Sequence, residues 1–239
     1  PLLENGDLIW TKAENLMAGD SIATPRLIEI YSQIPNILDL LEPEFVKIIN
    51  QELIQDTILK LKEKYGAFKK TADILEINYD HFKSFNRKNY PGRPSLSLFK
   101  KMISHLDLEL DYFKNKIKKI SYVDNKFTNP IPISLPNISE ELMYALGLLN
   151  SDGHISRKNI SFINNDETLH ESFKKKIKEL FDLNVKNYSP KTSDISNKTL
   201  YIILKKLESV LSTLPNNLII SWLKGCADGN GCPLLKEDG

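Results

Sequence analysis

The chain has 239 residues, of which 41% are hydrophobic, so it can bury at least one sizeable core and form one to three domains. Its two cysteines, Cys226 and Cys232, have no Cys or His neighbours at metal-ligand spacing, and two cysteines cannot form a secreted disulfide framework. We find no signal peptide and no apolar run of about 18 residues, so we expect a cytoplasmic protein without a membrane partner.

The formal net charge of +1 conceals an uneven distribution along the chain. Residues 1–59 hold 3 Lys or Arg against 10 Asp or Glu, residues 60–120 hold 15 against 7, and residues 121–239 hold 14 of each. A basic centre between acidic and neutral flanks favours a nucleic-acid-binding module in residues 60–120. A solvated lysine-rich helical surface is the alternative interpretation.

Residues 1–30 are typical of β-structure, with a turn at Asn5-Gly6 and a short strand after it. The stretch NGDLIWTKAENLMAGDSIATPR, from Asn5 to Arg26, resembles part of the Hint domain of inteins. This resemblance implies descent from an intein. The residues that the family uses for splicing, an N-terminal Cys or Ser, a Thr-x-x-His motif and a C-terminal His-Asn pair, are missing from this sequence. The chain alone is therefore not expected to splice.

Residues 33–120 are predicted to form a helical domain. A helical stripe of apolar residues runs from Phe45 to Lys64, and a further helix is expected from Ser97 to Leu106. Within residues 65–88, a helix at 67–75, a turn at 76–78 and a helix at 79–86 have the spacing of a helix-turn-helix unit. Ala72 is small, as a close helix crossing requires, and the expected apolar seam consists of Phe68, Ile74, Leu75, Ile77 and Phe82.

The second helix of such a unit enters the major groove of DNA. Arg and Lys suit guanine edges and phosphates, and Asn suits adenine, so we expect DNA contacts from Lys83, Asn86, Arg87 and Lys88. An ordinary helical hairpin is the alternative. Residues 121–138 contain Pro130, Pro132 and Pro136 and are predicted to be a stiff extended linker.

Two related motifs follow the linker. Ser139 is expected to cap a helix of residues 140–151, which contains ALGLLNSDG (residues 145–153), and a second copy, LKGCADGNG, spans residues 223–231. Their matching glycines lie 78 residues apart. Small residues spaced i, i+4 let two helix backbones approach closely, and the two pairs are Gly147 with Ser151 and Gly225 with Gly229.

Each motif ends in an acid or an amide followed by glycine, at Asp152-Gly153 and Asn230-Gly231. We expect the glycine to be a helix C-cap. A carboxylate at the negative end of a helix dipole is unfavourable unless a cation compensates it. Two such helix ends held side by side are therefore suited to bind Mg²⁺ and to align a phosphodiester for hydrolysis.

The paired motifs resemble those of LAGLIDADG homing endonucleases, over about residues 139–239. The resemblance implies an α+β fold built on αββαββ repeats, a monomer with two pseudo-symmetric repeats when complete, and magnesium-dependent cleavage of specific double-stranded DNA. It also implies that Asp152 and Asn230 are the catalytic metal ligands. Asn230 stands where the family has an acid, so the second half-site is expected to bind metal weakly.

Between the motifs we expect a hairpin at 154–164, a helix at 167–181, and strands near 185–188 and 198–203. The resemblance implies that this sheet lies in the major groove, with Arg157, Lys158 and Lys191 contacting DNA. It also implies a catalytic lysine near each metal, for which Lys198 is the first candidate and Lys191 the second.

The second copy stops eight residues after Gly231, so we expect a fragment of an intein-encoded homing endonuclease. Two alternatives stay open. One is a non-cleaving nucleic-acid-binding protein, such as a regulator or a maturase, on the same scaffold, which Asn230 favours. The other is a remnant of a protein-splicing element.

Overall fold

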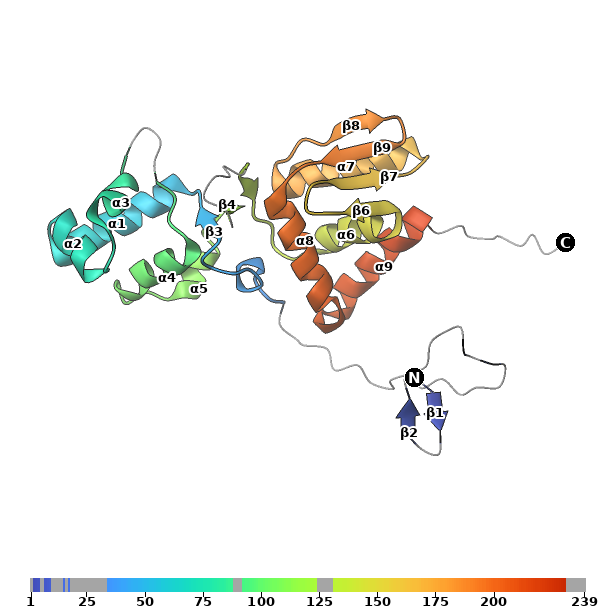
Figure 1. The fold of residues 1–239 in the computed structure, drawn as a ribbon, viewed down its shortest axis with the longest axis horizontal. Coiled ribbons are helices and arrows are strands. Elements are labelled where there is room, and N and C mark those ends of the chain that lie inside the picture. The colour runs from blue at the N-terminus through green and yellow to red at the C-terminus, as the bar shows by residue number, and fades with distance from the viewer. Residues whose placement is uncertain are drawn as a thin grey trace.

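The computed structural model describes residues 2–4, 7–9, 15, 17, 34–87, 92–123 and 131–230. Beyond residue 33 the chain forms two halves along its long axis, one mainly helical and one built of helices around a sheet (Figure 1). The protein therefore combines helices with antiparallel sheets, as an α+β fold requires. Among these residues, no helix has the length and apolar character that a membrane span needs.

A short hairpin lies near the N-terminus. Strands β1 (Leu2–Glu4) and β2 (Asp7–Ile9) pair antiparallel, so the expected turn falls between them. Most of the remaining Hint-like stretch, up to residue 26, lies outside the described residues.

The helical half contains α1 (Gln51–Tyr65), α2 (Phe68–Ile74), α3 (Tyr79–Ser84), α4 (Leu96–Ser104) and α5 (Leu110–Lys114). The helix expected from residue 45 starts later, because residues 46–48 form strand β3 (Val46–Ile48). Val46 and Ile48 are both fully buried, and they alternate with half-buried Lys47. This alternation is the strand period of two, so the helical assignment was wrong there.

The helices α2 and α3 form the expected pair with a tight turn between them. Ala72 is fully buried at their contact, and Phe82 packs on Phe68 with ring centroids 5.8 Å apart. In the turn, Glu76 adopts the left-handed conformation (φ 53°), and the Asn78 side chain accepts a hydrogen bond from the backbone NH of His81, which caps α3. The turn chemistry and the small residue at the crossing together fix the angle between the helices.

The segment expected to be an extended linker contributes two strands. Strands β4 (Lys119–Tyr122) and β5 (Ile133–Ser134) join β3 in a sheet of order β3-β4-β5. Ile120 and Ile133 are register partners and both are fully buried, which explains why the segment packs. Pro132 precedes the edge strand, where a proline removes no ladder hydrogen bond. Residues 124–130, including Pro130, lie outside the described part of the chain.

The second half contains α6 (Glu140–Asp152), β6 (Gly153–Ile155), β7 (Ile160–Ile163), α7 (Glu167–Phe181), β8 (Lys186–Ser189), β9 (Thr192–Ile195), α8 (Lys198–Val210) and α9 (Asn216–Asn230). Its sheet has the order β6-β7-β9-β8 and is antiparallel throughout. The hairpin, helix α7 and the cap of α6 by Ser139 are confirmed.

The strand predicted at residues 198–203 is wrong, because α8 begins at Lys198. Asn197 caps it by accepting a hydrogen bond from the NH of Leu200. The β-branched pair Ile202-Ile203 suggested a strand, but Leu200, Ile203, Leu204 and Leu207 are all buried at helical spacing. The last strand is instead β9, four residues of mixed polarity.

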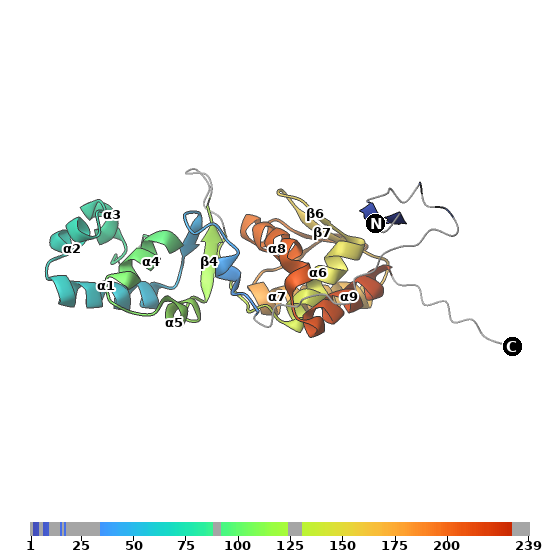
Figure 2. The ribbon, with the colours of Figure 1, turned by 90° about the horizontal axis from the view of Figure 1, so that it is seen from below.

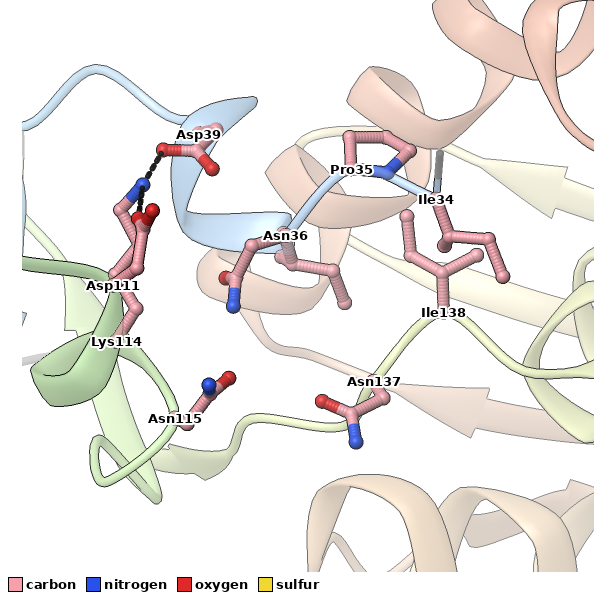
Figure 3. Close-up of a pocket in the computed structure, with 10 residues that line it drawn as sticks. Ile34, Pro35, Asn36, Asp39, Asp111, Lys114, Asn115, Asn137 and Ile138 are labelled. Carbon is pink, nitrogen blue, oxygen red and sulfur yellow. Dashed lines mark ion pairs between the residues drawn. The ribbon is translucent and has the colours of Figure 1, made fainter. Parts of the chain in front are cut away.

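Several polar contacts join the two halves. The Tyr122 hydroxyl donates to Glu42, which also accepts from Lys206 of α8 at 2.6 Å. The NH of Tyr122 donates to the hydroxyl of Thr199. Beside this junction a cavity of about 440 Å³ lies between the segment before β3 and the segment before α6, and the ion pairs of Lys114 with Asp39 and Asp111 line it (Figure 3).

Candidate metal and nucleic-acid site

The helices α6 and α9 touch through their small residues. A side chain added at Gly147 would lie 2.9 Å from the Cys226 nitrogen, and one added at Gly225 would lie 3.0 Å from the Leu148 nitrogen. Gly229 faces the side chain of Ser151 one turn further on. The backbones therefore meet with no space for even a methyl group, which explains why glycine occupies both central positions.

This close contact brings the ends of both motifs to one place. Asp152 ends α6 and Asn230 ends α9, and both line a cavity of about 430 Å³. Its other lining residues come from the end of β7 and the turn between β8 and β9, and they are Ile163, Asn164, Asn165, Lys191 and Gly229. The cavity joins two helix ends to one end of the sheet.

Asp152 is half-buried and is held by Asn164. The Asn164 side-chain amide donates a hydrogen bond to Oδ2 of Asp152. Asn164 is itself fixed, because its side-chain oxygen accepts from the NH of Asp166 at 2.7 Å and its backbone NH donates to the carbonyl of Lys191 at 3.2 Å. Buried His170 contacts the Asn164 carbonyl through Nε2 at 3.0 Å. These bonds orient the Asp152 carboxylate and leave Oδ1 for another partner.

Asn230 is more exposed than Asp152. Its side-chain nitrogen donates to the backbone carbonyl of Ser151 at 3.0 Å. Its side-chain oxygen can therefore accept or coordinate, although it carries no charge. The pair supplies one carboxylate and one amide oxygen, so the two half-sites differ in strength.

Asp228, the other acid near the end of α9, is engaged elsewhere. The Tyr144 hydroxyl donates to Oδ2 of Asp228 at 2.8 Å. Burial, together with this bond and the charge of Asp228, raises the pKa of Tyr144 to about 12. Asp228 does not line the cavity that holds Asp152, so it does not stand in for an acid at position 230.

The donor set fits Mg²⁺ only in part. Across residues 34–87, 92–123 and 131–230, no three His, Cys, Asp or Glu side chains gather as a metal site. Mg²⁺ needs fewer protein ligands than that, because it keeps several waters and binds through one or two carboxylates plus substrate phosphates. Asp152, with the Asn230 amide oxygen, meets this lower requirement when a phosphate completes the shell.

The two candidate catalytic lysines lie apart. Lys198, the first choice, is the first residue of α8 and does not line the cavity. Its expected place on a strand beside the metal is therefore wrong. Lys191, the second choice, is exposed in the turn between β8 and β9 and lines the same cavity as Asp152. Lys191 is thus the lysine that the fold brings to the motif ends.

The sheet covers its inner face with helices and leaves its outer face open. Phe162 of β7 packs on Phe173 of α7 with ring centroids 5.0 Å apart. In the view of Figure 2, α7 and α9 lie beneath the strands. Arg157 and Lys158 are exposed in the turn between β6 and β7, and Lys191 is exposed in the turn at the other end. Basic side chains therefore flank the sheet at both ends.

The expected DNA contacts of the helical half lie at the end of α3. Lys83, Asn86 and Arg87 are exposed, whereas Lys88 lies outside the described residues. Lys83 lies over the Tyr79 ring at 5.8 Å, which keeps its ammonium on the surface of α3.

Reasoning from the sequence missed Asn164. It stands one residue beyond the strand that ends at Ile163, in the run Asn164-Asn165-Asp166 before α7. An Asx-rich turn at a strand end indicates a helix cap, and Asp166 does cap α7. The contact of Asn164 with Asp152 depends on the packing of β7 against α6, which no local pattern reveals.

No family model matches the chain. Over 231 residues, or 92% of its length, it is 22% identical to one component of the A-type ATP synthase of Methanopyrus kandleri, of which the match covers 22%. Over 119 residues it is 28% identical to an uncharacterized protein of Methanocaldococcus jannaschii, covering 43% of this chain and 45% of that one. The chain thus spans less than half the length of either relative and is similar to a part of each.

Proposed function

We propose that the chain is part of an intein-encoded homing endonuclease, which binds a specific double-stranded DNA site and hydrolyses it with magnesium. One observation carries this proposal: the close pair of α6 and α9 delivers Asp152 and Asn230 to one cavity beside an open sheet. A helix pair without a shared site would need no polar side chain at both ends.

The chemistry divides between the cation and the chain. Mg²⁺, when bound, neutralises phosphate charge and makes a bound water more acidic. Asp152 holds the cation through its free oxygen, while Asn164 keeps the carboxylate oriented. Asn230 supplies a neutral oxygen on the second side. Lys191 at the rim of the cavity holds the phosphate or the leaving oxygen.

DNA binding uses both halves of the molecule. Both views place α3 and the strands on the same side of the long axis, so one duplex along that side meets both (Figures 1 and 2). The helical half contains most of residues 60–120, with 15 basic against 7 acidic residues. Phosphate contacts from such a surface give strong binding at low salt.

The ATP synthase relative supports an inserted origin. Nearly the whole chain matches a segment that makes up 22% of that protein. The chain has no Gly-x-x-x-x-Gly-Lys-Ser/Thr phosphate loop, so nothing in its sequence assigns it to nucleotide binding by this motif. An element inserted into a host protein, with Hint sequence at its border, accounts for both features.

A non-cleaving nucleic-acid-binding protein is the second candidate. It is favoured by the neutral, exposed side chain of Asn230 and by the engagement of Asp228 with Tyr144. A remnant of a splicing element is the third, and the hairpin of β1 and β2 is the described structure that bears on it.

The test is binding of the full chain to random-sequence duplex DNA, followed by fluorescence anisotropy across salt concentrations. The affinity should fall with a log–log slope of about −0.9 per phosphate contacted. Arg87→Ala should reduce the slope by about one unit. Glu109→Ala, an exposed residue of the same half, is the control and should not reduce it. An affinity that does not change with salt would overturn the proposal.

A further inference from the structure

An acid and a base face each other on the outer surface of the sheet, at the end away from Asp152. Asp194 of β9 is the direct register partner of Lys186 of β8 and of Ser161 of β7. Register partners share a face, and buried Phe162 and Ser193 belong to the opposite one. Asp194 and Lys186 also line a common cavity of about 670 Å³.

The Asp194 carboxylate has an unused oxygen. Its Oδ1 atom is buried and accepts no hydrogen bond within the described structure. A buried oxygen without a donor is unfavourable, so this site favours a ligand that donates a hydrogen bond. Asp182 lines the same cavity but differs, because it pairs with Lys178 at 2.7 Å and Lys119 at 3.2 Å. Asp194 is thus the acid in this cavity that is suited to an external donor.

The chemistry of the pair selects a particular ligand. A carboxylate repels phosphate, so an acid on a DNA-binding face is suited to a base edge. In the major groove a C·G pair presents the N4 amino group of cytosine beside the O6 and N7 acceptors of guanine. A carboxylate accepts from the amino group, and an ammonium donates to the two acceptors.

We propose that Asp194 and Lys186 together recognise one C·G base pair in the DNA target. Asp194 accepts a hydrogen bond from cytosine N4, and Lys186 donates to guanine O6 or N7. Rotation about the Cβ–Cγ bond of Asp194 brings either carboxylate oxygen to the cavity. This inference rests on the proposed DNA-binding function and adds a base-pair preference to it.

The register also sets where this base pair lies. Asp194 is three residues along the chain from Lys191, which lines the Asp152 cavity. A strand rises about 3.3 Å per residue, close to the roughly 3.4 Å step between base pairs. With the strands along the groove, the C·G pair lies about three base pairs from the phosphate held at Asp152.

The experiment is selection of bound duplexes from a randomised library by the full chain, followed by sequencing. The unmodified chain should enrich a motif with one C·G position, preferred about 5- to 150-fold over other pairs. Asp194→Asn should change that position alone toward A·T, because Asn pairs with the N6 and N7 groups of adenine. Asp182→Asn, which removes the same charge from the same cavity, should leave the motif unchanged.

Lys186→Gln is the second variant, on the exposed edge strand, and decides the matter if circular dichroism shows that Asp194→Asn has not folded. It should weaken the preference at the same position. The same motif from the unmodified chain and both folded variants would overturn the inference and leave DNA binding intact. Variants that alter two different positions would overturn joint recognition of one base pair. No enriched motif from the unmodified chain would overturn this inference and the specificity in the proposed function together.

Discussion

The side-chain amide of Asn164 donates a hydrogen bond to the carboxylate of Asp152, from the end of β7 to the end of α6. Asn164 is held in turn by Asp166, Lys191 and buried His170. The carboxylate therefore has a fixed orientation before any ligand arrives. Groups that orient a metal ligand in this way typically contribute a roughly 10- to 100-fold factor in affinity.

Asn164→Ala should therefore weaken binding of a divalent cation by about 10- to 100-fold. Mn²⁺ titration followed by electron paramagnetic resonance measures this, with Mn²⁺ in place of Mg²⁺ and duplex DNA present. Asn165→Ala removes an exposed amide from the same cavity and serves as the control. Equal losses from both variants would mean that Asn164 does not orient the metal ligand.

Gly225→Ala should lower the free energy of unfolding by about 1–3 kcal/mol, because the added methyl group meets the backbone of α6. Urea denaturation measures this change. Lys224→Ala, on the exposed side of the same helix, should change stability little. At Gly229 the obstacle is the Ser151 side chain, so Ser151→Gly should rescue Gly229→Ala. An unchanged stability for Gly225→Ala would contradict the close pairing.

The junction between the halves should weaken in acid. Hydrogen bonds from Lys206 and then from Tyr122 lower the pKa of Glu42 in the folded protein. A carboxylate with a lowered folded pKa stabilises the fold above its unfolded pKa of about 4.3, and this contribution is lost as the pH falls through the folded value.

Glu42→Gln should thus flatten the dependence of stability on pH below about 4.3. Thermal unfolding across a series of acidic buffers measures this dependence. Glu44→Gln, an exposed acid two residues away, is the matched control and should keep the slope of the unmodified chain. An identical slope for the Glu42 variant would show that the junction does not use this carboxylate.

Local patterns predicted the elements whose signals are local. Ser139, the periodic apolar face of α7 and the small Ala72 each determine their structure within a few residues, and these elements appear where expected. The errors arose where tertiary pairing decides. Strand β3 exists because it pairs with β4, and α8 is a helix because its apolar stripe packs against the core.

The candidate site was predictable in the same measure. The repeated motif indicated both the helix pair and the two helix ends. Gly153 was expected in a left-handed cap, yet its φ is −110°, and the glycine is needed because a side chain would meet the Leu149 backbone. The meeting of Lys191 and Asn164 with Asp152 depends on the register of β7 with β9, which the sequence does not encode locally.

The most direct measurement is cleavage of supercoiled plasmid that carries the selected site, followed as nicked and linear DNA in Mg²⁺. Each strand needs its own activated water, so the unequal pair of Asp152 and Asn230 should produce mainly nicked product. Asn230→Asp should raise the linear product, and Asp152→Asn should abolish cutting. Cutting by Asp152→Asn at the rate of the unmodified chain would contradict the proposed role of this carboxylate. The absence of magnesium-dependent cutting by both the unmodified chain and Asn230→Asp would contradict the proposed nuclease and favour the non-cleaving binding protein.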